Sequence, residues 1–338
     1  MSETPASTAG VPVSGRPIPG RAGGPGVVFT TRQRRLAELG LLLVMVSWAV
    51  NFITVKGTGE QIPPMTFAWV RFTAAGLLLL GLLRWREGSI RLPRRDVLPL
   101  VLLGFVGFGI YQVLWASAIQ LISAGDSALL IATTPVLAVL MAVVVRSDTI
   151  TVPKLAGTLV SFAGVAVVVG RAGSGADQGA LVGYLVTLLA AVCWGLYTTV
   201  GAPVLRRNSP LRVAAWAVMF GALFLAPFGF VAARDADWSR VEPIAYAGWV
   251  YSGLIAAGIA NVVMYDGIRV LGPARAVPFQ FLVPIFAVVI GALVLAESIR
   301  ANQVVGGLII VAGVLLTRRG RPGRSPEAVS GTTSLPPE

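Results

Sequence analysis

Amide, hydroxyl and indole side chains recur deep inside long apolar runs of this sequence, where each polar group must find a partner. Together they offer hydrogen-bond donors, acceptors and flat aromatic faces, which is the chemistry of binding rather than of bond breaking. We therefore expect them to line a cavity for a small, partly apolar solute. Hydrogen bonds between helices, without any ligand, are the alternative interpretation. The candidates are Trp48, Asn51, Gln112, Trp115, Trp194, Tyr197, Asn261, Tyr265 and Gln280.

One arginine, Arg71, also lies within an apolar run and completes the set of candidate binding residues. Placing an arginine inside a membrane costs about 2.5–3.5 kcal/mol on insertion scales, so such a residue points to a function. Two interpretations remain open. Arg71 serves an outward gate or attracts a carboxylate or phosphate, or its long side chain reaches out to the membrane surface. Ala68 and Ala75 share its helical face, and small residues favour a face turned towards protein.

Acidic residues near the apolar runs are few, and two of them are candidates for proton coupling. Asp126 stands at the start of one run, and Asp266 stands near the end of another, three residues before Arg269. That spacing also allows an ordinary ion pair on a helix surface. Asp148 and Glu297 instead stand just before apolar runs, where a carboxylate can cap the helix that follows.

The elements that position these residues are ten apolar runs, each about as long as a membrane-spanning helix. The chain has 338 residues, of which 55% are hydrophobic and 12% charged, and its mean hydropathy is +0.79. A soluble domain carries about 25% charged residues, so this composition predicts an all-α membrane protein. The runs are 36–56, 65–85, 97–119, 125–145, 152–170, 180–201, 212–233, 244–266, 274–295 and 301–317.

Two tails rich in Pro, Gly and Ser flank the runs, at residues 1–35 and 319–338, and we expect both to be disordered. With the N-terminus inside, 21 of the 27 Lys and Arg residues fall on the inner side and five fall outside. This bias is typical of the positive-inside rule, and it predicts that both termini are cytoplasmic. The net charge of +12 thus reports orientation, and nucleic-acid binding is the weaker interpretation.

The sequence also repeats itself at an offset of 149 residues. The residues that this offset pairs include Pro135 and Pro284, Asp148 and Glu297, Gly157 and Gly306, and Gly164 and Gly313. Each half, at 36–170 and 180–318, holds five runs, so the second half enters the membrane from the opposite side. Inverted repeats of this kind build the two gates of many secondary transporters around one central site. An ancestral duplication kept only for packing is the alternative.

The paired prolines and glycines predict different structural features. Pro135 and Pro284 fall in mid-run, where each removes a backbone hydrogen bond and predicts a bend or break that a gate could use. A simple packing kink explains them equally well. The paired glycines stand two helical turns apart, which places them on one face and favours close helix packing in lipid.

Three motifs resemble those of the EamA family, in the drug/metabolite transporter superfamily. They are VSWAVNFITVK at 46–56, FAWVRFTAAGLLLL at 67–80 and LAESIRANQVVGGLIIVAGVLL at 295–316. The resemblance covers residues 36–318, and it implies a ten-helix carrier of small metabolites, often an exporter, in a bacterial inner or plasma membrane. It implies no particular substrate. The first half departs from the family at Asp148, where the family usually has Glu.

A secondary transporter that alternates access between two inverted repeats is therefore the leading hypothesis. A nucleotide-driven pump is disfavoured, because the chain has no G-x-x-x-x-G-K-[ST] motif. A channel or a non-transporting membrane scaffold is the alternative. An intramembrane enzyme is weaker still, because the chain has no histidine and a single cysteine, Cys193, in an apolar run. We expect no metal and no cofactor, a small solute and the bilayer as partners, and either a monomer or a homodimer.

Overall fold

The apolar runs of the sequence form helices, which satisfy their own backbone hydrogen bonds and so tolerate lipid. The computed structural model describes residues 29–144, 151–170, 178–271 and 273–319, and every regular element among them is helical. Eight helical stretches in this part of the chain are long and apolar enough to cross a membrane. Two shorter apolar helices follow, at Pro278–Val294 and Ala301–Thr317.

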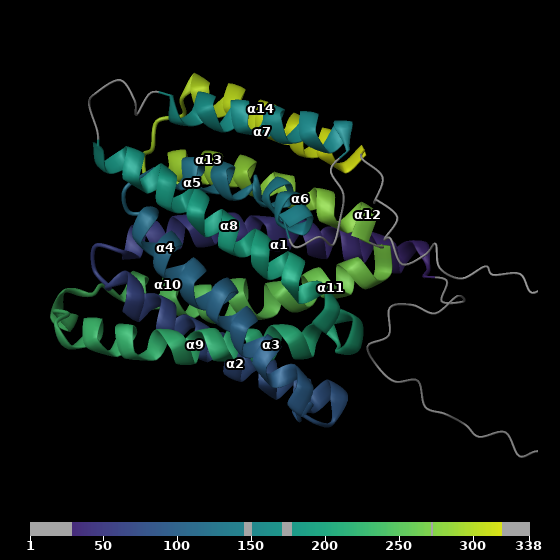
Figure 1. Cartoon of the computed structure of the whole chain (residues 1–338). Helices are drawn as coiled ribbons and strands as arrows, with labels where there is room; N and C mark the ends of the chain where they lie inside the picture. The colour runs from purple at the N-terminus through teal and green to yellow at the C-terminus, as the bar shows by residue number, and fades with distance from the viewer. Residues whose placement is uncertain (1–28, 145–150, 171–177, 272, 320–338) are drawn as a thin grey trace, which may run out of the picture.

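The helices lie side by side, with their connections gathered at two ends of the bundle (Figure 1). The first helix, α1 (Thr31–Thr58), begins at the end where the last helix, α14 (Ala301–Arg319), finishes. We call this the tail end, and the opposite end the far end. Three further unbroken crossings run between them: α2 (Pro64–Glu87), α8 (Gln178–Arg207) and α9 (Pro210–Arg234).

The helix ends differ a little from those that the sequence predicts. Thr30 caps α1, because its side chain accepts from the Gln33 backbone N–H while the Gln33 side chain accepts from the Thr30 N–H. The helix therefore begins at Thr31, within the segment 1–35 that we expected to be disordered. At the other terminus α14 includes Arg319, which we had assigned to the C-terminal tail.

Two crossings contain a stretch of π-helix in their middle. The first runs through α3 (Arg94–Gly104), a π-helix at Phe105–Ile110 and α4 (Tyr111–Ala118). The second runs through α10 (Pro243–Val250), a π-helix at Tyr251–Ile259 and α11 (Ala260–Leu271). Such π-helical turns are rare and occur frequently at functional sites.

Two further crossings are broken where the sequence holds Pro135 and Pro284. One consists of α5 (Ala124–Ile131) and α6 (Thr134–Val144), separated by a turn. The other consists of α12 (Pro273–Ala276), a 3₁₀-helix at Val277–Phe281 and α13 (Leu282–Val294). The expected break is present in both, but neither proline is in mid-helix. Each stands in the first turn after the break, where its missing N–H costs nothing.

The four paired glycines lie where α7 (Val152–Val169) packs along α14. A Cβ atom built on Gly164 would lie 2.7 Å from the carbonyl oxygen of Gly306. One built on Gly157 would collide with Thr317 and with the carbonyl of Gly313. The two backbones therefore approach more closely than any larger side chain allows. This helix pair lies at one edge of the bundle, beyond α5 and α13 (Figure 1).

Candidate functional site

A cavity of about 520 Å³ lies between the broken crossings, the π-helical crossings and helices α1, α2 and α8. Its size falls within the range of small-molecule sites, and its walls are mostly apolar. Of the ten residues that we expect to bind solute, all but Gln112 line this cavity, and Pro135 and Pro284 do so as well. The lining residues among the ten are Trp48, Asn51, Arg71, Trp115, Trp194, Tyr197, Asn261, Tyr265 and Gln280.

Arg71 points into the bundle rather than out to the membrane surface. Its side chain lines the cavity, although only 5% of the residue is exposed. Its Nη1 donates to the Asn51 Oδ1 at 3.2 Å and to the Ser252 Oγ at 2.9 Å. Its Nη2 donates to the Gln112 Oε1 at 3.2 Å. All three acceptors are neutral, so the guanidinium is hydrogen-bonded but not neutralised by them.

Gln112 and Ser252 support Arg71 from behind the cavity wall. Both are fully buried, and the Ser252 hydroxyl also lies 2.5 Å from the Asn51 Oδ1. Our prediction that Gln112 faces the cavity is therefore wrong: it holds the guanidinium instead. Ser252 escaped the sequence analysis because a lone serine in an apolar run is common, and at the 149 offset it pairs with Leu103, so the repeat does not mark it.

Aromatic rings make up much of the remaining wall. Tyr111 stacks on Trp115 with ring centroids 6.2 Å apart, and Trp194 lies 5.0 Å from Tyr197. Phe108 contacts both Trp194 and Tyr197 edge-on. Sequence reasoning missed Tyr111 and Phe108. The position of Tyr111 could have predicted that it lines the cavity, because it stands one helical turn before Trp115 and so shares its helical face.

The cavity reaches towards the tail end. Gly201 and Leu205, in the last turns of α8, line it, together with Ile268 near the end of α11. Leu205 is also 40% exposed, so this part of the wall meets the surface. Among the described residues, no hydrogen bond or ion pair joins α8 to α11 or α12 across this opening.

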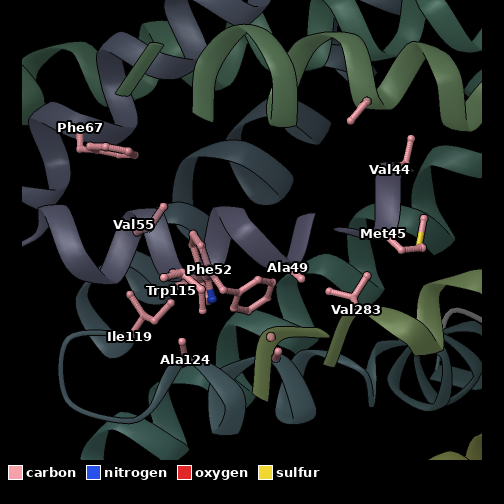
Figure 2. Close-up of a cluster of buried hydrophobic side chains, with 14 of the residues drawn as sticks. Val44, Met45, Ala49, Phe52, Val55, Phe67, Trp115, Ile119, Ala124 and Val283 are labelled. Atoms are coloured by element: carbon pink, nitrogen blue, oxygen red, sulfur yellow. The ribbon is translucent and has the colours of Figure 1, made fainter. Parts of the chain in front are cut away.

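Towards the far end, Phe52 and Trp115 close the cavity. Their rings meet edge-to-face with centroids 5.1 Å apart, and the two side chains lie side by side in Figure 2. Ile119 and Ala124 pack next to them in the same cluster of buried side chains. Each of these four residues is less than 8% exposed. A solute in the cavity therefore has no passage to the far end in this conformation.

A polar cluster covers this apolar seal, and we call it the far-end latch. It consists of Lys56, Glu297 and the backbone groups of Ile119, Ile122 and Ala124. The Lys56 Nζ lies 3.6 Å from a Glu297 carboxylate oxygen and donates to the carbonyls of Ile119 and Ile122. The Glu297 carboxylate accepts from the Ala124 N–H at 2.9 and 3.1 Å. The latch thus joins the end of α1, the α4–α5 connection and the loop before α14.

Glu297 caps a helix, but not the one that we predicted. Because it bonds the Ala124 N–H, it caps the first turn of α5 rather than the start of α14. At α14 that task falls to Gln303, whose side chain accepts from the Arg300 N–H at 3.0 Å. Asp148, the partner of Glu297 in the repeat, lies outside the described residues.

The two candidates for proton coupling lie away from the cavity. Asp126 is 1% exposed, and its carboxylate accepts from the Arg300 guanidinium and the Tyr184 hydroxyl, both at 2.8 Å. Asp266 lies on the surface near the tail end, 3.6 Å from Arg269 as its spacing allows. Neither carboxylate lines the central cavity. Among the described residues, the cavity lining contains no acidic side chain.

Comparison with known proteins agrees with the architecture. The model of the EamA-like transporter family matches residues 35–170 and again residues 181–319. A probable terminal-alkyne amino-acid exporter of Streptantibioticus cattleyicolor is 32% identical over 293 residues, which cover 86% of this chain and 96% of that protein. An uncharacterized transporter of Archaeoglobus fulgidus is 27% identical and covers 83% of this chain and 96% of its own.

A solved crystal structure shares the fold. It has a TM-score of 0.59 and 20% identity, and the match covers 84% of this chain and 97% of the other. The two matched segments of the family model span most of the sequence, and the relatives match it nearly from end to end. The chain belongs to the EamA-like transporter family.

Proposed function

We propose that this protein is a secondary transporter that exports small organic metabolites across the plasma membrane of a bacterium. The observation that carries the proposal is the central cavity, which reaches the tail end and is sealed at the far end. A cavity with access from one side only is what alternating access requires of each of its two main states. The name of the Streptantibioticus relative, an exporter of an amino acid, supports an organic solute and outward transport.

The tail end is proposed to face the cytoplasm. Helices that finish or begin there carry clusters of basic residues, whereas the far end carries few. The tail-end clusters include Arg84, Arg86, Arg94, Arg95, Arg206 and Arg207. Basic residues are enriched on the cytoplasmic side of membrane proteins. With this orientation, the cavity collects its solute from the cytoplasm, as an exporter must.

We further propose ten membrane spans in two inverted halves of five, at 36–170 and 180–318. The two shorter apolar helices would then be the ninth and tenth spans, because a span can be short where the surrounding bilayer thins. Three features support the repeat. The family model matches twice, and the two π-helices end at Ile110 and Ile259, which are 149 residues apart. The turn at 132–133, between α5 and α6, pairs at the same offset with 281–282, where the 3₁₀-helix meets α13.

The two gates of the proposed cycle are not copies of each other. At the offset of 149, Ala124 pairs with Pro273, which has no N–H to offer a carboxylate. At the offset of 146 that holds in the early part of each half, Lys56 pairs with Ala202. Two of the groups that form the far-end latch, the Lys56 ammonium and the Ala124 N–H, are therefore missing at the positions that pair with them. Opening the far end requires the Lys56–Glu297 contacts to release, while the walls near Leu205 and Ile268 approach each other.

The experiment that tests this function has two steps. A strain that overproduces the protein is first compared with an empty-vector strain for resistance to toxic metabolite analogues and for secreted metabolites. The solutes found are then tested with purified protein in liposomes. Saturable uptake that is accelerated by unlabelled solute on the opposite side indicates a carrier. Flux that rises without saturation indicates a channel, and no flux of any solute would contradict transport altogether.

A further inference from the structure

We infer that the central cavity binds an organic carboxylate with an apolar body, and that Arg71 receives the carboxylate. The inference rests on the proposed function only in treating the cavity as the solute site. The first observation concerns the charge of Arg71. Arg71 is 95% buried, and among the described residues no Asp or Glu lies within ion-pair distance of it. A buried charge without a counter-charge is unfavourable unless a ligand supplies one.

An unsatisfied donor at the same place points to an acceptor that is not part of the chain. The Arg71 Nε is buried and has no hydrogen-bond partner among the described residues. Buried donors in folded proteins are almost always paired, so an unpaired donor on an uncompensated cation is unusual. A planar group with two anionic oxygens suits a guanidinium fork better than any neutral group does.

The rest of the cavity selects the body of the solute. Ten of the described aromatic residues line the cavity together with Arg71, among them Trp48, Phe72, Tyr111, Trp115, Trp194 and Tyr197. The Arg71 guanidinium carbon lies 4.4 Å from the centre of the Phe72 ring and 5.8 Å from that of Trp115. The carboxylate would therefore bind at the edge of an apolar, aromatic chamber, with the body of the solute against the rings.

The charge of the cavity lining also determines which solutes the cavity excludes. No acidic side chain of the described residues lines it, so a basic solute would meet Arg71 without any compensating carboxylate. An α-ammonium group next to the carboxylate is tolerable, because the aromatic faces and the Asn261 and Gln280 amides can receive it. The expected class thus includes simple carboxylates and zwitterionic amino acids with apolar side chains, and it excludes amines.

The test measures binding to the purified, full-length protein by quenching of tryptophan fluorescence, because Trp48, Trp115 and Trp194 line the cavity. The probes share one body and differ in the head group: 4-phenylbutanoate, 4-phenylbutan-1-ol and 4-phenylbutylamine, with L-phenylalanine as the zwitterion. We expect the carboxylate to bind wild-type protein at least tenfold more tightly than the alcohol or the amine. Equal binding of carboxylate and alcohol, or no binding of any acid, would overturn the inference.

Two variants then test whether Arg71 causes the preference for the carboxylate. Arg71→Gln should bring the affinities for carboxylate and alcohol within about threefold of each other while binding of the alcohol persists, which shows that the site is still folded. Arg71→Lys keeps the charge without the fork and should retain part of the preference. Arg269→Gln is the matched control, an exposed arginine outside the cavity, and should behave as wild type. An unchanged carboxylate preference in Arg71→Gln would show that Arg71 is purely structural.

This experiment can fail separately from the proposed function. It measures equilibrium binding in detergent, whereas the transport proposal depends on flux across liposomes. A transporter of another class of solute would show saturable counterflow without any head-group preference among these probes. A protein that binds carboxylates but moves nothing would show the preference without flux.

Discussion

Charged side chains join helices and connections at both ends of the bundle, but the contacts at the two ends have different roles. At the far end, Lys56 and Glu297 join three separate connections directly above the sealed part of the cavity. At the tail end, the Asp96 carboxylate accepts from Arg207 at 2.7 Å and from Asn208 at 2.9 Å, which ties α3 to the end of α8. Arg86 and Asp266, 3.4 Å apart, tie α2 to α11.

The difference lies in what the contacts bridge. The tail-end pairs join helices that are already neighbours, and none of them crosses the opening between Leu205 and Ile268. The far-end latch spans the place where a passage would have to form. Breaking tail-end contacts should therefore affect the stability of the fold, whereas breaking the latch should affect which side the cavity faces.

Asp96→Asn should have the largest effect, and it should be on stability. The Asp96 side chain is 1% exposed, and its loss of charge leaves Arg207 without a counter-charge. Removing one partner of a buried pair costs about 3–5 kcal/mol, and the exposure of Arg207 places the expected loss near the lower value. Thermal unfolding in detergent measures it. The side from which the cavity is accessible should remain as in wild type. A change in access would contradict the assignment of stability to the tail-end contacts and of access to the far-end latch.

Glu297→Gln should shift access while leaving stability nearly unchanged. The substitution keeps an acceptor for the Ala124 N–H but removes the ion pair with Lys56 and the charge that strengthens the cap. We expect the ratio of the conformation open at the far end (far-open) to the one open at the tail end (tail-open) to rise about tenfold. The measurement is the rate at which an impermeant thiol reagent, added outside, reacts with Ala128→Cys in a Cys193→Ser background.

The control for this prediction is Glu242→Gln. Glu242 also lies near the far end, but among the described residues its carboxylate bonds only the Gln61 side chain, at 3.4 Å, and it takes no part in the latch. Outside labelling in this variant should match wild type. Equal labelling in the Glu242 and Glu297 variants would show that lost negative charge, and not the latch, controls access.

Lys56→Gln should also favour the far-open form, but by less than Glu297→Gln does. Its ammonium lies 3.6 Å from the carboxylate and is partly exposed, so the pair is worth at most about 1 kcal/mol, or about fivefold. Combining it with Glu297→Gln gives a double-mutant cycle. If the two residues act as one latch, the double variant should shift access by less than the product of the single effects.

Arg86→Gln should have the smallest effect of all. Both side chains of the Arg86–Asp266 pair are about 40% exposed, and such surface pairs contribute about 0–1 kcal/mol. Labelling from either side and the unfolding temperature should both stay close to wild type. A shift in access as large as that of Lys56→Gln would mean that the tail end has a latch of its own.

Much of this arrangement could be predicted from the sequence, because lipid makes polar residues conspicuous. Trp48, Asn51 and the lone Arg71 stand out against apolar neighbours, and a polar group in a membrane helix must face protein. The helix breaks near Pro135 and Pro284 could be predicted in the same way, because proline is tolerated in the first turn of a helix but not in its interior. These signals are local, and each can be read from one helix at a time.

The remainder depends on which helices meet, and a single sequence does not state that. Gln112 is polar and lies within its span, yet only its distance from Arg71 reveals that it supports the guanidinium rather than the solute. Glu297 precedes α14 in the chain but caps α5, because the loop before α14 folds over the far end. Phe52 and Trp115 look like any other apolar wall residues until their contact shows that they close the cavity.

We propose that the cavity opens to the cytoplasm and is sealed from the outside. Ala128 tests it most directly, because it lines the cavity just below the sealed end and is itself buried. The single reactive cysteine of Ala128→Cys in the Cys193→Ser background is labelled with a small impermeant thiol reagent in inside-out and in right-side-out vesicles. We expect labelling at least tenfold faster from the cytoplasmic side. Equal rates from the two sides, or faster labelling from outside, would contradict it.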